Sequence, residues 1–141
     1  MRIAAAGVVL AWLIALSCYD VAERRLPNLL TLPGAAVILL TAWCAGRGWP
    51  AVAGAAALAG LYLLVHLAAP AGMGAGDVKL AIGLGALAGC FGVAVWFAAA
   101  LAAPLLTALL GLSRGAASLP HGPSMCLATA GALALAWLPL L

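Results

Sequence analysis

Three acidic residues, Asp20, Glu23 and Asp77, carry all the side-chain carboxyl groups of this 141-residue chain. Asp20 ends one long apolar run, and Asp77 lies just before another. If both runs cross a membrane, the two aspartates sit at a membrane edge, where ionisable groups are costly and usually functional. Two carboxyl groups held close together cannot both ionise easily, so they can share a proton and move it. The alternative is that each aspartate is a solvated loop charge, balanced by the Arg and Lys residues beside it.

The composition places most of the chain in a lipid environment. Hydrophobic residues make up 68% of the chain and charged residues only 6%, with a mean hydropathy of +1.26. A soluble domain has about 25% charged residues, so we expect an all-α integral membrane protein. The net charge of +3 is too scattered to indicate a nucleic-acid surface. With two histidines, and four cysteines that form no CxxC pair, we expect no metal site and no cofactor.

The apolar runs predict six transmembrane helices in a single domain, residues 1–141. The runs are Ile3–Tyr19, Leu29–Gly46, Ala51–Ala69, Leu80–Ser113 and Pro123–Leu141. The run from Leu80 to Ser113 is too long for one crossing of a ~30 Å hydrocarbon core, so it must fold back. We place the turn at "GCFG", Gly89–Gly92, which divides this run into two short spans.

The basic residues predict the orientation. Those that follow the first, third and fifth spans are Arg24, Arg25, Lys79 and Arg114, and those on the opposite side are Arg2 and Arg47. Basic residues favour the cytoplasmic side of a membrane. Both termini are therefore expected outside the cytoplasm, with Asp20 and Asp77 at the cytoplasmic edge.

Three glycines, Gly72, Gly74 and Gly76, alternate up to Asp77. Glycine permits positive φ angles and a close approach by a neighbouring backbone. A helix that starts at such an elbow can present Asp77 to a cleft that holds an extended peptide. A flexible loop between helices is the alternative.

Three sequence motifs resemble those of one protease family. The string "GAGD", Gly74–Asp77, is similar to the GxGD signature of polytopic membrane aspartyl proteases, and "GMGAGDVKLA" resembles its form in type IV prepilin peptidases. Upstream, "DVAERRLPNLLTLPG", Asp20–Gly34, resembles the other signature of that family. Downstream, "LPHGPSM" is similar to a Pro-x-Gly-Pro element before the last span. The three motifs occur in the family's order.

The resemblance implies an aspartic endopeptidase with Asp20 and Asp77 as catalytic residues and Gly74, Gly76 and Lys79 in supporting roles. The implied substrate is a prepilin, Flp/Tad-like prepilin or pseudopilin whose short basic leader is cleaved after a glycine. Cleavage would occur at the cytoplasmic face of the inner (plasma) membrane, in a multi-pass protein. The chain lacks CxxC pairs and so resembles the short, peptidase-only form, without the region associated with N-methylation.

Two other functions fit a chain of this composition. A small proton-coupled transporter or channel subunit would use Asp20 and Asp77 as proton relays, although relays favour the middle of the membrane. A structural assembly factor would need neither aspartate.

The remaining acidic residue and the two histidines are expected to have structural or surface roles. Glu23 is expected to face water or Arg24, His66 to bond a neighbouring helix or reach the interface, and His121 to be a plain loop residue. The GxxxG pair of Gly85 and Gly89 predicts close helix packing, within the chain or in a dimer. The oligomeric state does not follow from the sequence.

Overall fold

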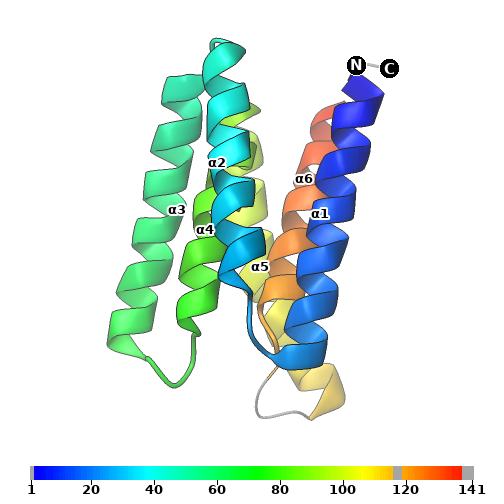
Figure 1. Ribbon diagram of the computed structural model, residues 1–141. Coiled ribbons are helices and arrows are strands. Elements are labelled where there is room, and N and C mark those ends of the chain that lie inside the picture. Colours follow the sequence, from blue (N-terminus) through cyan, green and yellow to red (C-terminus); the bar gives the residue numbers. More distant parts are fainter. Residues whose placement is uncertain (1, 116–118, 138–141) are drawn as a thin grey trace.

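The computed structural model describes residues 2–115 and 119–137, which form six α-helices that alternate in direction (Figure 1). The helices are α1 (Arg2–Glu23), α2 (Asn28–Cys44), α3 (Gly48–Ala68), α4 (Ala75–Cys90), α5 (Val93–Arg114) and α6 (Gly122–Trp137). The predicted all-α class is confirmed. Three helices are long and apolar enough to cross a membrane, α1 over Ile3–Glu23, α3 over Gly48–Ala68 and α5 over Val93–Ser113.

The other three helices are shorter. Helix α2 has 17 residues, and α4 and α6 have 16 each. A helix of 16 residues rises about 24 Å, which is less than the ~30 Å hydrocarbon core. The count of six spans and the position of the termini therefore stay predictions.

The predicted fold-back of the long apolar run is present, but its two halves are unequal. Helix α4 ends at Cys90 and α5 begins at Val93, with Phe91 and Gly92 between them. Gly92 has φ 109°, a conformation that favours glycine. Helix α5 continues for 22 residues, so the prediction of two short spans was wrong for the second one.

The ends of the other predicted spans also differ from the helices in the structure by a few residues. Helix α1 continues past Tyr19 to Glu23, so Asp20 lies in its last turn and does not follow it. Helix α6 begins at Gly122, one residue earlier than expected, and its predicted end at Leu141 lies outside the described residues.

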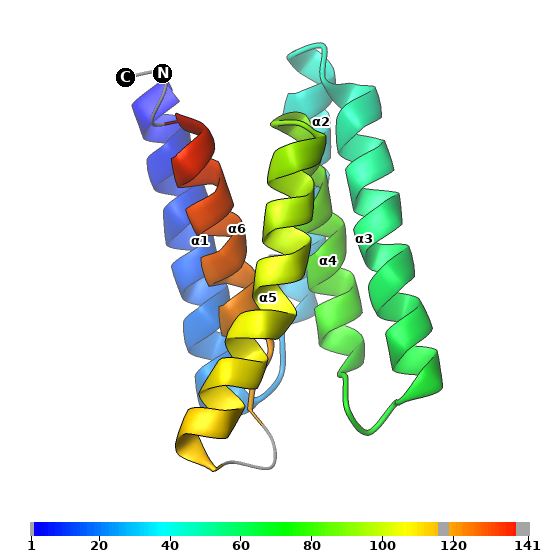
Figure 2. The ribbon, with the colours of Figure 1, turned by 180° about the vertical axis from the view of Figure 1, so that it is seen from behind.

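Helix α4 occupies the centre of the bundle. It contacts α2, α3, α5 and α6, and Figures 1 and 2 show it enclosed from both sides. Its side chains are buried along most of its length, including Leu80 and Leu84. Because its neighbours cover it, a short helix carrying Asp77 avoids the cost of a lipid-exposed charge.

Glycines allow α4 to approach α3 closely. A methyl group added to Gly85 would collide with the carbonyl oxygen of Gly54, and one added to Gly89 would collide with that of Pro50. The GxxxG pair on α4 therefore packs against α3 within the chain, in the manner of membrane helix pairs. This contact fixes the position of the helix that carries Asp77.

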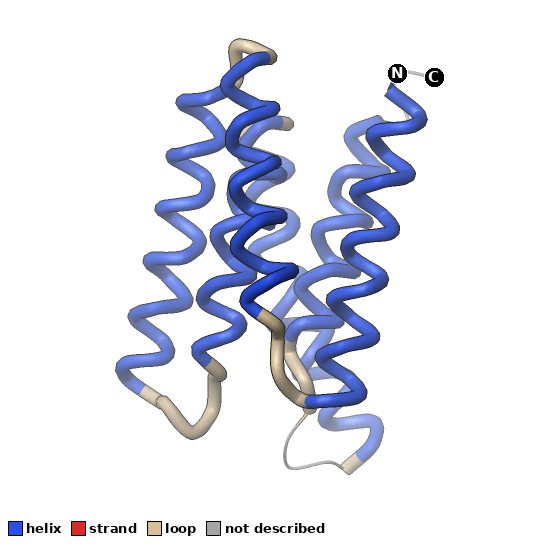
Figure 3. The backbone as a smooth tube through the Cα atoms, in the orientation of Figure 1, coloured by secondary structure: helices blue, strands red, loops and turns tan. Residues whose placement is uncertain are grey.

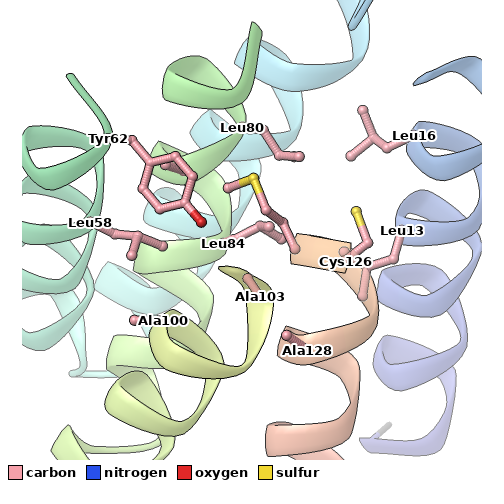
Figure 4. Packing of buried hydrophobic residues seen from close by; sticks show 12 residues of the cluster. Leu13, Leu16, Leu58, Tyr62, Leu80, Leu84, Ala100, Ala103, Cys126 and Ala128 are labelled. Atoms are coloured by element: carbon pink, nitrogen blue, oxygen red, sulfur yellow. The ribbon is translucent and has the colours of Figure 1, made fainter. Parts of the chain in front are cut away.

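Helix α1 lies beside α6, and Trp12 connects it to α2. The indole Nε1–H of Trp12 donates a hydrogen bond of 2.9 Å to the carbonyl oxygen of Leu30. The ring lies against Gly34 of α2 and Gly83 of α4. A buried cluster that includes Leu13, Leu16, Leu80 and Leu84 fills the space between these helices (Figure 4).

Candidate active site

The connections between helices place the three sequence motifs at one end of the bundle. The α1–α2 and α3–α4 loops and the start of α6 all lie at the end opposite the start of α1 (Figures 1 and 3). A cavity of about 320 Å³ opens at this end. Its lining residues are Asp20, Arg24, Arg25, Leu26, Gly74, Ala75, Gly76, Asp77 and Lys79. All five residues that the sequence singled out as catalytic or supporting therefore line one cavity.

Asp20 is held by the opposite end of the chain. It is 6% exposed, and its Oδ2 accepts a hydrogen bond of 3.0 Å from the backbone N–H of Gly122, the first residue of α6. A Cβ atom on Gly122 would lie 2.5 Å from this same oxygen. Only glycine can bring its N–H so close to the carboxyl group, which explains the residue type at this position.

Asp77 is held by the helix that carries it. It is the third residue of α4, is 8% exposed, and its N–H donates to the carbonyl oxygen of Gly74 at 3.1 Å. Its Oδ2 lies near Gly74, where a Cβ atom would be 3.6 Å away. The side chain thus lies at a helix N-terminus, where backbone N–H groups lack partners within the helix.

The two aspartates lie close enough to interact electrostatically. Both are buried among apolar helices, and both line the cavity. Burial weakens solvent screening, so two carboxyl groups in this setting resist simultaneous ionisation. The fold therefore brings two buried carboxyl groups to one cavity.

The glycine elbow works by close approach and not by unusual backbone angles. None of Gly72, Gly74 and Gly76 has a positive φ angle. A Cβ atom on Gly76 would lie 3.2 Å from the Cβ of Leu26, in the α1–α2 loop. The absence of a side chain on Gly76 lets this loop lie against the start of α4, which brings the two motifs together.

Lys79 joins the same two motifs through its side chain. Its Nζ donates a hydrogen bond of 2.9 Å to Oδ1 of Asn28, the first residue of α2. Arg24 ends α1 in a left-handed conformation with φ 49°, and its N–H donates to the carbonyl oxygen of Asp20 at 3.0 Å. Glu23 is exposed and is not among the residues that line the cavity, in agreement with its predicted role.

Both histidines bond to elements near the site. His66 Nδ1 lies 2.7 Å from the carbonyl oxygen of Met73, in the α3–α4 loop, so it bonds a loop and not the predicted helix. His121 is half-buried and hydrogen-bonds Tyr62 and Thr107, so the prediction of a plain loop residue was wrong. No local pattern in the sequence marked these contacts of His121.

Four residues near the aspartates were not found from the sequence. Tyr62 and Cys126 lie within electrostatic range of Asp77, and Cys126 also hydrogen-bonds Ser17. Asn28 was part of a recognised motif but had no assigned partner. No local pattern marked Tyr62, Ser17 or Cys126, because each belongs to an otherwise apolar helix.

Comparison with known proteins gives a family. The type IV leader peptidase family matches residues 7–112, which is more than half of the chain. The match includes the motifs that contain Asp20 and Asp77. No curated protein and no solved structure matches this chain.

Proposed function

The chain belongs to the type IV leader peptidase family, and from this premise we propose that it is an aspartic endopeptidase with Asp20 and Asp77 as its catalytic pair. The observation that carries the proposal is the meeting of two buried carboxyl groups, from distant parts of the sequence, at one cavity. Aspartic proteolysis requires such a pair because the reaction needs a base and an acid at the same water molecule.

The reaction would proceed by proton exchange between the pair and the substrate. The ionised carboxyl group takes a proton from water as the water oxygen bonds to the peptide carbonyl carbon. The neutral carboxyl group gives its proton to the carbonyl oxygen. The resulting tetrahedral diol then collapses and the C–N bond breaks. The leaving amine takes a proton from the pair, and one hydroxyl of the diol returns its proton to the pair as the product carbonyl forms.

Helix starts hold both carboxyl groups in place for this exchange. The Gly122 N–H donates to Asp20 at the start of α6, and Asp77 lies in the first turn of α4. Neither helix start needs to move during the reaction, because both helices are packed in the bundle. Such fixed donors reduce the reorganisation that the transition state would otherwise require.

The proposed topology has six spans, both termini outside the cytoplasm, and the cavity at the cytoplasmic face of the inner (plasma) membrane. Arg24, Arg25 and Lys79 line the cavity, whereas Arg47 belongs to the connection between α2 and α3, which lies at the other end of the bundle (Figure 1). The cytoplasmic preference of basic residues therefore supports this orientation. The position of both aspartates at one end of the bundle does not favour a proton relay.

The proposed substrate is a prepilin or pseudopilin with a leader that ends in glycine, followed by an apolar membrane helix. Amides inside a continuous membrane helix are hydrogen-bonded and shielded, so they resist attack. A glycine at the junction interrupts the helix and exposes the scissile amide. The cavity lies at the end of the bundle, where such a junction would arrive.

The test is processing of a prepilin by purified protein in lipid vesicles, followed by the shift of the product on a gel. Asp20→Asn and Asp77→Asn should each reduce cleavage to background, because an amide can neither accept the water proton nor donate one in exchange. Glu23→Gln is the matched control, since Glu23 is exposed and does not line the cavity. Cleavage near the wild-type rate by either Asn variant would refute the proposal.

A further inference from the structure

A chain of hydrogen bonds joins three elements beside the catalytic pair. The hydroxyl of Tyr62, on α3, lies 2.9 Å from His121 Nε2. On the other side of the ring, His121 Nδ1 lies 2.6 Å from Oγ1 of Thr107, on α5. Thr107 in turn donates to the carbonyl oxygen of Ala103, one turn earlier in its own helix, at 3.2 Å. The imidazole ring is therefore held from both sides.

One arrangement of the hydrogens gives each of these polar atoms a partner. In it, Thr107 donates its single hydroxyl hydrogen to Ala103 and accepts from His121 Nδ1, which carries a proton. In a neutral ring Nε2 is then an acceptor, and it receives the hydroxyl hydrogen of Tyr62. With His121 neutral and protonated at Nδ1, both ring nitrogens and the hydroxyls of Tyr62 and Thr107 all take part in this series of hydrogen bonds.

His121 is also covalently next to the donor on Asp20. The peptide bond between His121 and Gly122 carries the N–H that donates to Asp20 Oδ2 at 3.0 Å. Pro120 and Pro123 flank these two residues and restrict the backbone on either side. A ring fixed between α3 and α5 therefore fixes the plane of this peptide bond. The direction of the Gly122 N–H depends on that plane.

We propose that His121, clamped by Tyr62 and Thr107, is a positioning residue that aims the Gly122 N–H at the catalytic carboxyl group of Asp20. The inference rests on the proposed function and adds a residue that is not itself part of the reacting groups. His121 acts only through Gly122. Tyr62 has a second connection to the site, because it lies within electrostatic range of Asp77.

The positioning role predicts a change in the pH dependence of cleavage. A fixed N–H donor favours the ionised form of the carboxyl group that it contacts. When the donor is misaligned, the acid limb of the pH–rate profile should move to higher pH. The other titratable groups facing Asp20 are Asp77 and Cys126, and the cavity adds Arg24, Arg25 and Lys79. All of them stay in place in the variants below.

Two conservative variants loosen the ring without changing the catalytic pair. Tyr62→Phe removes the donor to Nε2, and Thr107→Val removes the acceptor from Nδ1. Each should lower kcat roughly 2- to 12-fold, the effect of one hydrogen bond, with KM unchanged. The matched controls are Tyr19→Phe, at a residue that is 49% exposed, and Thr41→Val, whose hydroxyl bonds only within its own helix. Both controls should behave as wild type.

Replacements of His121 itself should separate its two contacts. His121→Gln can place an acceptor near Tyr62, and His121→Asn can place a donor near Thr107. Each should retain more activity than His121→Ala, which loses both contacts and should be slower than wild type roughly 5- to 150-fold. If His121→Ala does not fold, the Tyr62 and Thr107 variants still decide the question.

A spectroscopic readout tests the inference without any cleavage. In ¹⁵N-labelled protein in lipid nanodiscs, the His121 signals, identified by their loss in His121→Gln, should show a neutral ring protonated at Nδ1. The Gly122 amide proton should shift in Tyr62→Phe and Thr107→Val, and in Asp20→Asn. An Nε2-protonated ring would overturn the inference. A Gly122 amide and a pH profile unchanged in both hydroxyl variants would also overturn it.

The two proposals fail separately. If Asp20→Asn still cleaves, the proposed function is wrong, whereas the Gly122 amide still reports on whether His121 aims it. If Asp20→Asn is inactive and the hydroxyl variants match wild type in every readout, only the positioning role is wrong.

Discussion

Lys79 donates a hydrogen bond of 2.9 Å to Asn28, which joins the start of α2 to the first turns of α4. These residues belong to the two motifs that carry Asp20 and Asp77. The hydrogen bond therefore links the two motifs directly. Lys79 also lines the cavity, so it can contribute charge as well as position.

Removal of this hydrogen bond should slow cleavage without abolishing it. Lys79→Ala and Asn28→Ala should each reduce kcat/KM by about 2- to 12-fold, because one hydrogen bond is lost while both carboxyl groups remain. The double variant should be no slower than the slower single variant, since the two residues share one contact. Fully multiplicative losses in steady-state kinetics would show that Lys79 and Asn28 act independently.

Gly122→Ala should inactivate the protein. The added methyl group would lie 2.5 Å from Asp20 Oδ2, so either the aspartate or the start of α6 must move. The loss of cleavage should reach at least about 10- to 100-fold, because displacement of a catalytic group by about 1 Å has costs of this order.

Gly131→Ala is the matched control for this change. It lies in the same helix, and a Cβ atom there would meet nothing within 4 Å. It should keep wild-type activity, and its thermal unfolding temperature should be equal or higher, since alanine favours helix over glycine. Equal activity of Gly122→Ala and Gly131→Ala would contradict the close contact at Asp20.

Gly85→Ala should destabilise the bundle. A methyl group at this position would collide with the carbonyl oxygen of Gly54, so α3 and α4 would have to separate. We expect a lower unfolding temperature in detergent, with a loss of about 1–3 kcal/mol that is typical of overpacking. Gly60→Ala on α3, which points into open space, provides the comparison. A Gly85→Ala protein as stable as Gly60→Ala would disprove the tight α3–α4 contact.

The two aspartates of the proposed catalytic pair should behave as a unit. The double variant Asp20→Asn/Asp77→Asn should cleave no more slowly than either single variant, because the loss of one member already removes the exchange of protons. The comparison requires single-turnover measurements with excess protein, so that residual rates can be resolved. A double variant that is slower by the product of the single effects would indicate separate roles.

The C-terminus should lie outside the cytoplasm. A reporter that is active only in the cytoplasm, fused after Leu141, should give no signal, whereas the same reporter in the α3–α4 loop should give one. This pattern follows from the cluster of Arg24, Arg25 and Lys79 at the cavity end of the bundle. A signal from the fusion after Leu141 would reverse the orientation and place the cavity outside.

Much of this architecture follows from the sequence alone. An apolar segment in lipid must satisfy its own backbone hydrogen bonds, so long uncharged runs determine helices wherever they occur. The fold-back near Gly92 follows equally directly, because one helix of that length would exceed the membrane. The family, and five of the residues that line the cavity, were predicted from short motifs, in which spacing along the chain carries the information.

Contacts between helices were decided only by the tertiary structure. Tyr62, Thr107 and His121 come from separate elements, and none of them has a local signature in its own segment. The pairing of Gly122 with Asp20 connects opposite ends of the sequence. A hydrogen bond depends on distances of a few ångströms between atoms, and those distances are set by how the helices pack. Short motifs therefore locate the carboxyl groups, whereas only the packed bundle determines which atoms hold them.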